Sequence, residues 1–184
     1  MDGRRSDTRE RIRSVAMELF SERGYERTSL REIADRLGVT KAAVYYHFRT
    51  KEDIVVSLSE DLRRGIDEIV NWAQSTPPGS ERAREILTRY GALLHGLGSD
   101  MVRFWHENQP AFRDLGFGTS LRYQFRTLGD LMTEPESEPL AIFHARQALL
   151  AISWSVSMMG DLPLTDEQRY AAATRIAAGI LAKS

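Results

Sequence analysis

Residues 28–51 have the sequence TSLREIADRLGVTKAAVYYHFRTK, which carries signals for two short helices separated by a tight turn. Ser29 and Glu32 have the spacing of a capping box, in which each side chain accepts a hydrogen bond from the backbone N–H of the other residue. Gly38 is suited to the left-handed backbone conformation that ends many helices. Thr40 is then placed to cap a second helix. The stretch therefore predicts a helix-turn-helix with one or two residues between its helices.

The second helix of this stretch is expected to have two different faces. Two short helices joined this tightly cross steeply, so a small residue is needed where they meet, and Ala34 stands there. Val44 and Phe48, four residues apart, form the inward apolar face, and we expect Tyr46 to join them in the core. Tyr45 then points outward. Small residues near the helix N-terminus, followed by Tyr, His and Lys, make this outward face suitable for contacts with base edges and phosphates.

Apolar residues upstream of this stretch recur at the spacing of a helix with one buried face. These residues are Ile12, Val15, Ala16, Leu19 and Phe20. Gly24 follows them and is expected to end that helix. Residues 8–50 therefore form a compact three-helix unit, which would be only marginally stable alone because so small a unit buries little surface.

Residues 8–54 resemble the Tet repressor family of transcription regulators. The resemblance rests on an amphipathic first helix, on Gly24 followed by Tyr25, and on the motifs T-S-L-R-E-I-A, L-G-V-T and V-Y-Y-H-F-R-T-K-E-D-I. It covers about a quarter of the chain and is specific, because many residue types stand at set offsets. It implies an all-α protein with a helix-turn-helix DNA-binding domain at residues 1–51 and a helical effector-binding and dimerisation domain at residues 52–184.

Residue type and resemblance together define the DNA contacts that we predict. They are Ser29, Arg31, Thr40, Lys41, Ala42, Ala43, Tyr45, His47 and Lys51. Lys51 begins the next helix, where an ammonium and the helix dipole could together hold a phosphate. His47 has an alternative role, since a histidine near the end of a helix often hydrogen-bonds the last carbonyls.

The distribution of charge supports this assignment modestly. Residues 1–51 hold 12 Lys and Arg against 8 Asp and Glu, a balance of +4. Residues 52–184 hold 13 against 18, a balance of −5. The isoelectric point of the whole chain, about 6.4, is therefore a poor guide, because the field of the face that meets the phosphates decides whether nucleic acid is attracted.

The remaining 133 residues show helical spacing and no alternating apolar run that would indicate a sheet. A long helix is expected to begin near Lys51 and to end before Pro77, and Pro and Gly separate the helices that follow. Because the long helix joins both predicted domains, it is the natural lever between them.

The last two helices, at about residues 139–159 and 165–182, have a different character. The first is apolar or small on nearly every side, and the second carries an apolar stripe among many alanines. A helix that is apolar nearly all round is buried on more than one side, which predicts a symmetric homodimer with a four-helix interface. The residues predicted at that interface are Ala148, Ile152, Ser155, Tyr170, Ala173, Ile176, Ala177 and Ile180.

A homodimer would present two recognition helices to half-sites roughly 34–36 Å apart, so the operator should be a palindrome. A small molecule that prefers a state with the two heads held apart would lower operator affinity. Aromatic and methionine side chains in the middle of the chain predict a pocket for an apolar or aromatic molecule, although each of them is alternatively plain core. The predicted pocket residues are Phe104, Trp105, His106, Asn108, Tyr123, Phe125, Trp154 and Met158.

Other classes of function are weaker interpretations of this sequence. The chain has no cysteine and no Gly-rich phosphate loop, and His106 lacks the second histidine that a zinc-protease helix needs. We therefore expect no enzyme activity, no metal and no cofactor. Two alternatives stay open: a regulator of the same fold that answers to a protein partner or to no effector, and a purely architectural DNA binder.

No apolar run is long enough for a membrane span and no signal-peptide pattern opens the chain, so we expect a cytoplasmic protein. The expected function is that of a repressor released from a palindromic operator by a small molecule. The position of the operator, which lies outside the chain, decides between repression and activation.

Overall fold

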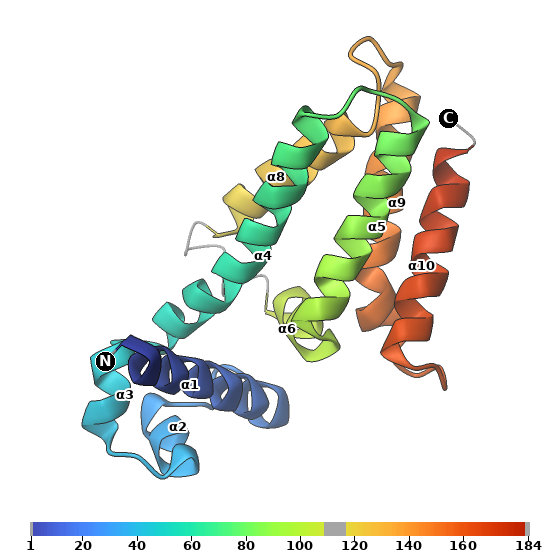
Figure 1. Cartoon of the computed structure of the whole chain (residues 1–184). Helices are drawn as coiled ribbons and strands as arrows, with labels where there is room; N and C mark the ends of the chain where they lie inside the picture. The colour runs from blue at the N-terminus through green and yellow to red at the C-terminus, as the bar shows by residue number, and fades with distance from the viewer. Residues whose placement is uncertain (1, 109–116, 183–184) are drawn as a thin grey trace. The chain divides into compact units, whose positions relative to one another are not determined.

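The computed structural model describes residues 2–108 and 117–182, and all regular secondary structure over these ranges is α-helical (Figure 1). The expected all-α class is therefore confirmed. The helices are α1 (Asp2–Arg23), α2 (Leu30–Leu37), α3 (Lys41–His47), α4 (Lys51–Gln74), α5 (Ser80–Leu97), α6 (Ser99–Glu107), α8 (Phe117–Leu131), α9 (Pro139–Met158) and α10 (Asp166–Leu181). Within the described ranges, no helix combines the length and the apolar character needed to cross a lipid bilayer.

Contacts within the chain divide it into two compact units, an N-terminal unit of residues 1–60 and a C-terminal unit of residues 61–184. The division falls inside α4, which is one continuous helix. The first turns of α4 therefore contribute to the core of the N-terminal unit, and its later turns contribute to the C-terminal unit.

The N-terminal unit has a shared apolar core, to which each of its helices contributes a buried face. Its most buried side chains are Ile12, Ala16, Leu19, Ile33, Ala34, Val44, Phe48, Ile54 and Val55. Arg9 of α1 lies with its guanidinium carbon 4.6 Å from the centre of the Phe48 ring and donates a hydrogen bond of 2.9 Å to the Ser57 hydroxyl of α4. These contacts attach the start of α4 to α1.

The predicted caps are all present in the N-terminal unit. The Ser29 hydroxyl accepts from the Glu32 N–H at 3.3 Å, and the Glu32 carboxylate accepts from the Ser29 N–H at 2.9 Å, which completes the capping box. Gly38 ends α2 with a φ of 68°, and the Thr40 hydroxyl accepts from the Ala43 N–H at 3.2 Å. Local chemistry thus sets both ends of the turn between α2 and α3.

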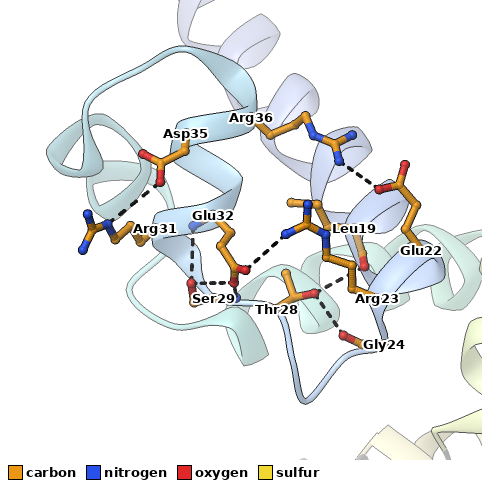
Figure 2. A network of polar contacts seen from close by, with 10 residues as sticks. All are labelled: Leu19, Glu22, Arg23, Gly24, Thr28, Ser29, Arg31, Glu32, Asp35 and Arg36. Carbon is orange, nitrogen blue, oxygen red and sulfur yellow. Dashed lines mark hydrogen bonds and ion pairs between the residues drawn. The ribbon is translucent and has the colours of Figure 1, made fainter.

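Polar contacts hold α2 against the end of α1 (Figure 2). Arg36 donates to Glu22 at 2.8 Å, and this hydrogen bond lowers the pKa of the Glu22 carboxyl. Arg23 reaches Glu32 of the capping box at 3.3 Å. The buried Thr28 hydroxyl donates within the α1–α2 connection, to the carbonyl of Gly24 at 3.0 Å. The exposed ion pairs add little stability individually, so their main effect is to orient α2 on α1.

The C-terminal unit is a bundle in which α9 and α10 lie side by side and α5 packs against α10 (Figure 1). Close approach of α5 and α10 requires the absence of a side chain at Gly91, where an added Cβ would lie 2.8 Å from the Thr174 hydroxyl. The buried Tyr90 and Ser153 hydroxyls are 2.8 Å apart, which joins α5 to α9 by a hydrogen bond inside the core.

Candidate nucleic-acid interface

Helix α3 presents an outward face that continues over two adjacent tyrosines. Val44 is fully buried beneath this face, whereas Lys41 and Ala42 are exposed. Ala43 is half-buried, and its N–H is engaged by the Thr40 cap. Tyr45 is 43% exposed, and the Lys41 ammonium lies 5.1 Å from the centre of its ring. The face therefore combines one cation, small side chains and an aromatic hydroxyl on a helix whose start is capped.

Tyr46 also belongs to this outward face, so the expectation that it packs in the core is wrong. It is 66% exposed, and its ring meets the His47 ring edge-on with the ring centres 5.3 Å apart. Successive helical residues are about 100° apart, so a residue two positions from both Val44 and Phe48 points away from the face that those two share. Phe48 is 1% exposed, as predicted. The spacing of the two buried residues was the signal that could have identified Tyr46.

The predicted contacts on α2 differ in how freely their polar groups can meet a ligand. The Ser29 hydroxyl is engaged by Glu32 on both its donor and its acceptor side, so its observed role is to begin the helix. The Arg31 side chain is 78% exposed, and its guanidinium is 3.9 Å from the Asp35 carboxylate. An ion pair that long and that exposed contributes little, which leaves the Arg31 cation open to a phosphate.

Lys51 has a structural role that its position in the sequence did not reveal. Its ammonium donates to the carbonyl of Tyr25 at 2.9 Å and lies 4.1 Å from the centre of the Tyr25 ring. A longer contact of 3.5 Å reaches the carbonyl of Glu26, and only 19% of the Lys51 side chain is exposed. The ammonium therefore ties the connection between α1 and α2 to the first turn of α4, and contact with a phosphate stays a prediction.

Tyr25 reinforces this tie from the other side. It is 5% exposed, and its hydroxyl donates to the Glu52 carboxylate at 2.8 Å. Burial, and then the neighbouring Glu52 carboxylate, raise the pKa of Tyr25 above its usual range, so the phenol stays protonated and remains a donor. Lys51, Tyr25 and Glu52 together form what we call the α4 anchor.

A second capping box, which sequence reasoning missed, starts α4. The Asp53 carboxylate accepts from the N–H groups of Arg49 and Thr50 at 2.9 and 3.0 Å, and the Asp53 N–H donates to the Thr50 hydroxyl at 3.1 Å. The spacing T-x-x-D is the local signal for such a cap. The cap fixes the turn that follows α3, in which Arg49 is exposed.

The structure brings some of the predicted pocket residues together and separates others. Phe104 and Trp105 of α6 are buried in the core at 3% and 6% exposure. The His106 ring is stacked on the Trp154 ring of α9, with the ring centres 4.2 Å apart and the planes 4° from parallel. His106 Nδ1 lies 2.6 Å from the Ser157 hydroxyl, and burial lowers the pKa of His106. His106 and Trp154 thus form one cluster between α6 and α9.

The other predicted pocket residues do not join this cluster. The Asn108 amide donates to the carbonyl of Phe104 at 2.9 Å, Tyr123 and Met158 are exposed, and Phe125 is half-buried. A separate cavity of about 290 Å³ lies between the first turn of α5, the α8–α9 connection and the last turn of α10. None of the eight predicted residues lines that cavity.

Most residues predicted at a dimer interface are buried within the chain's own C-terminal unit. The residues concerned are Ala148, Ile152, Ser155, Tyr170, Ala173 and Ala177, all at 8% exposure or less. They pack among α5, α9 and α10, and their part in a dimer interface stays a prediction. Ile176 is 62% exposed and Ile180 is half-buried. A helix that is apolar on all sides has apolar residues both on the face packed inside the chain and on the face turned outward. Helical periodicity alone does not identify which residues belong to the inner face.

The fold and the exposed α3 define a helix-turn-helix unit, and comparison with known proteins shows what that unit is similar to. Residues 12–58 match the family model described as bacterial regulatory proteins, tetR family. The HTH-type transcriptional regulator AcrR of Shigella flexneri is 41% identical over 83 residues, which cover 44% of this chain and 39% of AcrR. The HTH-type transcriptional repressor BepR of Brucella suis is 42% identical over 65 residues, 35% of this chain and 31% of BepR.

The whole fold is similar to that of a solved structure. The crystal structure of AmtR from Mycobacterium smegmatis has a TM-score of 0.67 and 24% sequence identity, and the match covers 94% of this chain and 85% of AmtR. Identity this low supports the fold alone. The chain spans about two fifths or less of the length of the curated relatives named above. Residues 12–58 therefore match the tetR-family domain of bacterial regulatory proteins, and the relatives that match this part of the chain are named transcriptional regulators.

Proposed function

We propose that this protein is a sequence-specific regulator of transcription that inserts α3 into the major groove of its operator. The observation that carries the proposal is the outward face of α3, in which Lys41, Ala42, Tyr45 and Tyr46 are exposed on a helix fixed at both ends. Small side chains allow close approach to base edges, and the ammonium and phenol groups are suited to phosphates. Arg31 extends the same set of donors from α2.

The name of one relative supports repression as the direction of control, since BepR is named a repressor. We extend this to the present chain as a repressor of the genes next to its operator. Its DNA contacts would then be those predicted from the sequence, with Tyr46 added.

A homodimer would form through the outer apolar residues of the last two helices. Those residues are Leu140, Phe143, Trp154 and Met158 on α9 and Ile176 on α10, each at least 37% exposed. The α9 residues recur at helical spacing, and exposed apolar residues gathered on one face mark an interaction surface. A second copy that packs on this face through a two-fold axis would require a palindromic operator.

A small apolar or aromatic molecule would release the operator by binding better to a form of the dimer that fits the DNA poorly. The His106–Trp154 cluster supports this part of the proposal, since a stacked aromatic pair with a polar Ser157 contact suits a planar ligand. Control by a protein partner is the alternative, and a ligand screen separates the two.

Selection of bound sequences from a random pool of duplex DNA, with the full-length protein, tests the proposed function. We expect enrichment of inverted repeats, and we expect Tyr45→Ala and Tyr46→Ala to weaken binding to the selected site. Leu162→Ala is the control, because Leu162 is a large exposed side chain, 43% accessible, in the connection between α9 and α10 and outside the proposed sites. A pool that shows no sequence preference after selection contradicts the proposal.

The dimer and the effector are tested separately. Phe143→Glu and Ile176→Glu each place a charge in the proposed interface, and we expect sedimentation to find monomers. Val56→Glu puts the same charge at an exposed apolar residue of α4 and should leave the dimer intact. For the effector, a screen of aromatic compounds should find some that both raise the melting temperature and lower operator affinity. If no compound does both, control by a protein partner or no control is the better account.

A further inference from the structure

Gln124 is a buried polar residue that joins α8 to α4 within the C-terminal unit. Its side-chain amide nitrogen donates to the Asp67 carboxylate at 2.6 Å and to the carbonyl of Arg63 at 3.2 Å. Gln124 is only 7% exposed. The second oxygen of Asp67 accepts from the Arg63 guanidinium at 2.7 Å. We call this arrangement of Gln124, Asp67 and Arg63 the α4–α8 clamp.

The clamp places a polar side chain at a buried position, which is less stable than an apolar side chain there. The side-chain oxygen of Gln124 is buried and has no hydrogen-bond partner among the described residues. A buried acceptor left without a donor destabilises the fold, whereas an apolar side chain of the same shape would avoid that cost. The benefit of an amide here is directional, because its hydrogen bonds hold α4 in one position along α8.

The side of α4 that faces α5 is shaped for close contact as well. An added Cβ at Gly65 would lie 2.3 Å from a methyl carbon of Leu93, so α5 approaches α4 closely at Gly65, on the side of the helix away from Arg63 and Asp67. Apolar contact of this kind is nondirectional and tolerates sliding or rotation of the helix. The clamp therefore supplies a directional contact to the position of α4, in addition to the Arg89 guanidinium of α5, which lies 4.0 Å from the centre of the Trp72 ring of α4.

Helix α4 links the clamp to the DNA-binding unit, because the same helix contributes residues to both units. It runs without interruption from Lys51 to Gln74, and Ile54, Val55 and Leu58 near its start are buried in the N-terminal unit. A rotation or shift of its later turns is transmitted along the helix, since its backbone hydrogen bonds make it stiff.

We propose that Gln124 is a positioning residue for operator binding, which holds α4 in the form that binds DNA. The proposal rests on the proposed function, and it adds the contact by which the C-terminal unit controls α4. A movement of α8 that breaks the two hydrogen bonds of Gln124 would release α4 and lower operator affinity.

The test is a double-mutant cycle on the full-length protein with the operator obtained by selection. Gln124→Met keeps the size of the side chain and removes both hydrogen bonds, and Asp67→Ala removes the main acceptor. We expect each single variant to bind the operator about fivefold more weakly, which corresponds to about 1 kcal/mol. The loss of affinity in the double variant should be smaller than the sum of the two single losses, because both changes break the Gln124–Asp67 hydrogen bond.

Two controls separate positioning from general stability. Thr127→Val removes a hydroxyl on α8 that donates only within its own helix, to the carbonyl of Tyr123, and should leave operator affinity unchanged. Melting temperatures of all variants are measured in parallel. A residue with a merely structural role would change the melting temperature and leave the affinity of the folded protein unaltered.

The outcomes are distinct. If the wild-type protein selects no DNA sequence, the proposed function fails and this inference fails with it. If the wild type binds and Gln124→Met binds equally well or more tightly, the inference alone is overturned. Effects of Gln124→Met and Asp67→Ala that simply add would also overturn it, because the two residues would then act independently.

Discussion

Replacement of Lys51 by methionine removes the ammonium from the α4 anchor and keeps an unbranched side chain of similar length. The change breaks the 2.9 Å hydrogen bond to the carbonyl of Tyr25 and the contact at 4.1 Å with the Tyr25 ring. A hydrogen bond from a charged group contributes about 1.5–3 kcal/mol, and a cation near an aromatic face adds about 0.5–1 kcal/mol when partly exposed. Methionine keeps some of the apolar contact. We therefore expect the free energy of unfolding of the N-terminal unit to decrease by about 2 kcal/mol.

Amide hydrogen exchange measures this loss where it occurs. All three tryptophans lie outside the N-terminal unit, at positions 72, 105 and 154, so tryptophan fluorescence would not report it directly. A loss of about 2 kcal/mol speeds exchange of the most protected amides of residues 12–48 about thirtyfold. Any phosphate contact made by Lys51 appears in a different measurement, as a decrease of about 0.9 in the slope of operator affinity against salt.

Lys41→Met is the matched control for this prediction. Lys41 is exposed on α3, and surface substitutions of this kind change stability by about 0.5 kcal/mol or less. The reasoning is refuted if Lys51→Met leaves exchange of these amides at the wild-type rate, or if Lys41→Met accelerates it as strongly.

Three further predictions concern single side chains. Ser29→Ala removes the hydroxyl of the α2 capping box and should lower the free energy of unfolding by about 1 kcal/mol. Urea unfolding followed by circular dichroism measures this change, and an unchanged midpoint would contradict the role of the cap. Phe48→Ala empties a site that is 1% exposed and should cost about 3–5 kcal/mol, whereas Tyr46→Ala should leave stability nearly unchanged; equal losses would contradict the assignment of the two faces. Burial lowers the pKa of His106 below its ordinary value of 6.5. As pH falls below about 6.5, His106 is therefore protonated in the unfolded chain before it is protonated in the folded protein. The free energy of unfolding decreases as a result. When the pH is lowered from about 7.5 to about 5.5, the melting temperature should therefore decrease less for His106→Gln than for the wild type. Equal decreases would show that the pKa of His106 is the same in the folded and unfolded states.

The helix ends of the N-terminal unit could be predicted because their causes are local. Ser29 and Glu32, or Thr40 and the N–H of Ala43, are three residues apart, and such short-range hydrogen bonds form wherever the chain begins a helix. The positive φ of Gly38 follows from its lack of a side chain. The helical class of the remaining chain was predictable for a similar reason, since periodicity is a property of one segment at a time.

Contacts between distant segments were beyond local reasoning. The ammonium of Lys51 meets a carbonyl 26 positions earlier, and the Gln124 amide meets Asp67 from 57 positions later, so nothing near either residue indicates its partner. Sequence reasoning placed Lys51 at a phosphate and did not single out Gln124, because each was considered only on its own helix.

The amino-acid sequence by itself determined which segments are helices, where the caps of α2 and α3 lie, and which family motif those two helices carry. Only the tertiary structure decided which apolar residues of α9 and α10 are interior, which polar groups are already engaged, and how α4 is held. The physical reason is that capping and periodicity depend on neighbours within about four residues, whereas burial and long-range hydrogen bonds depend on which helices pack together.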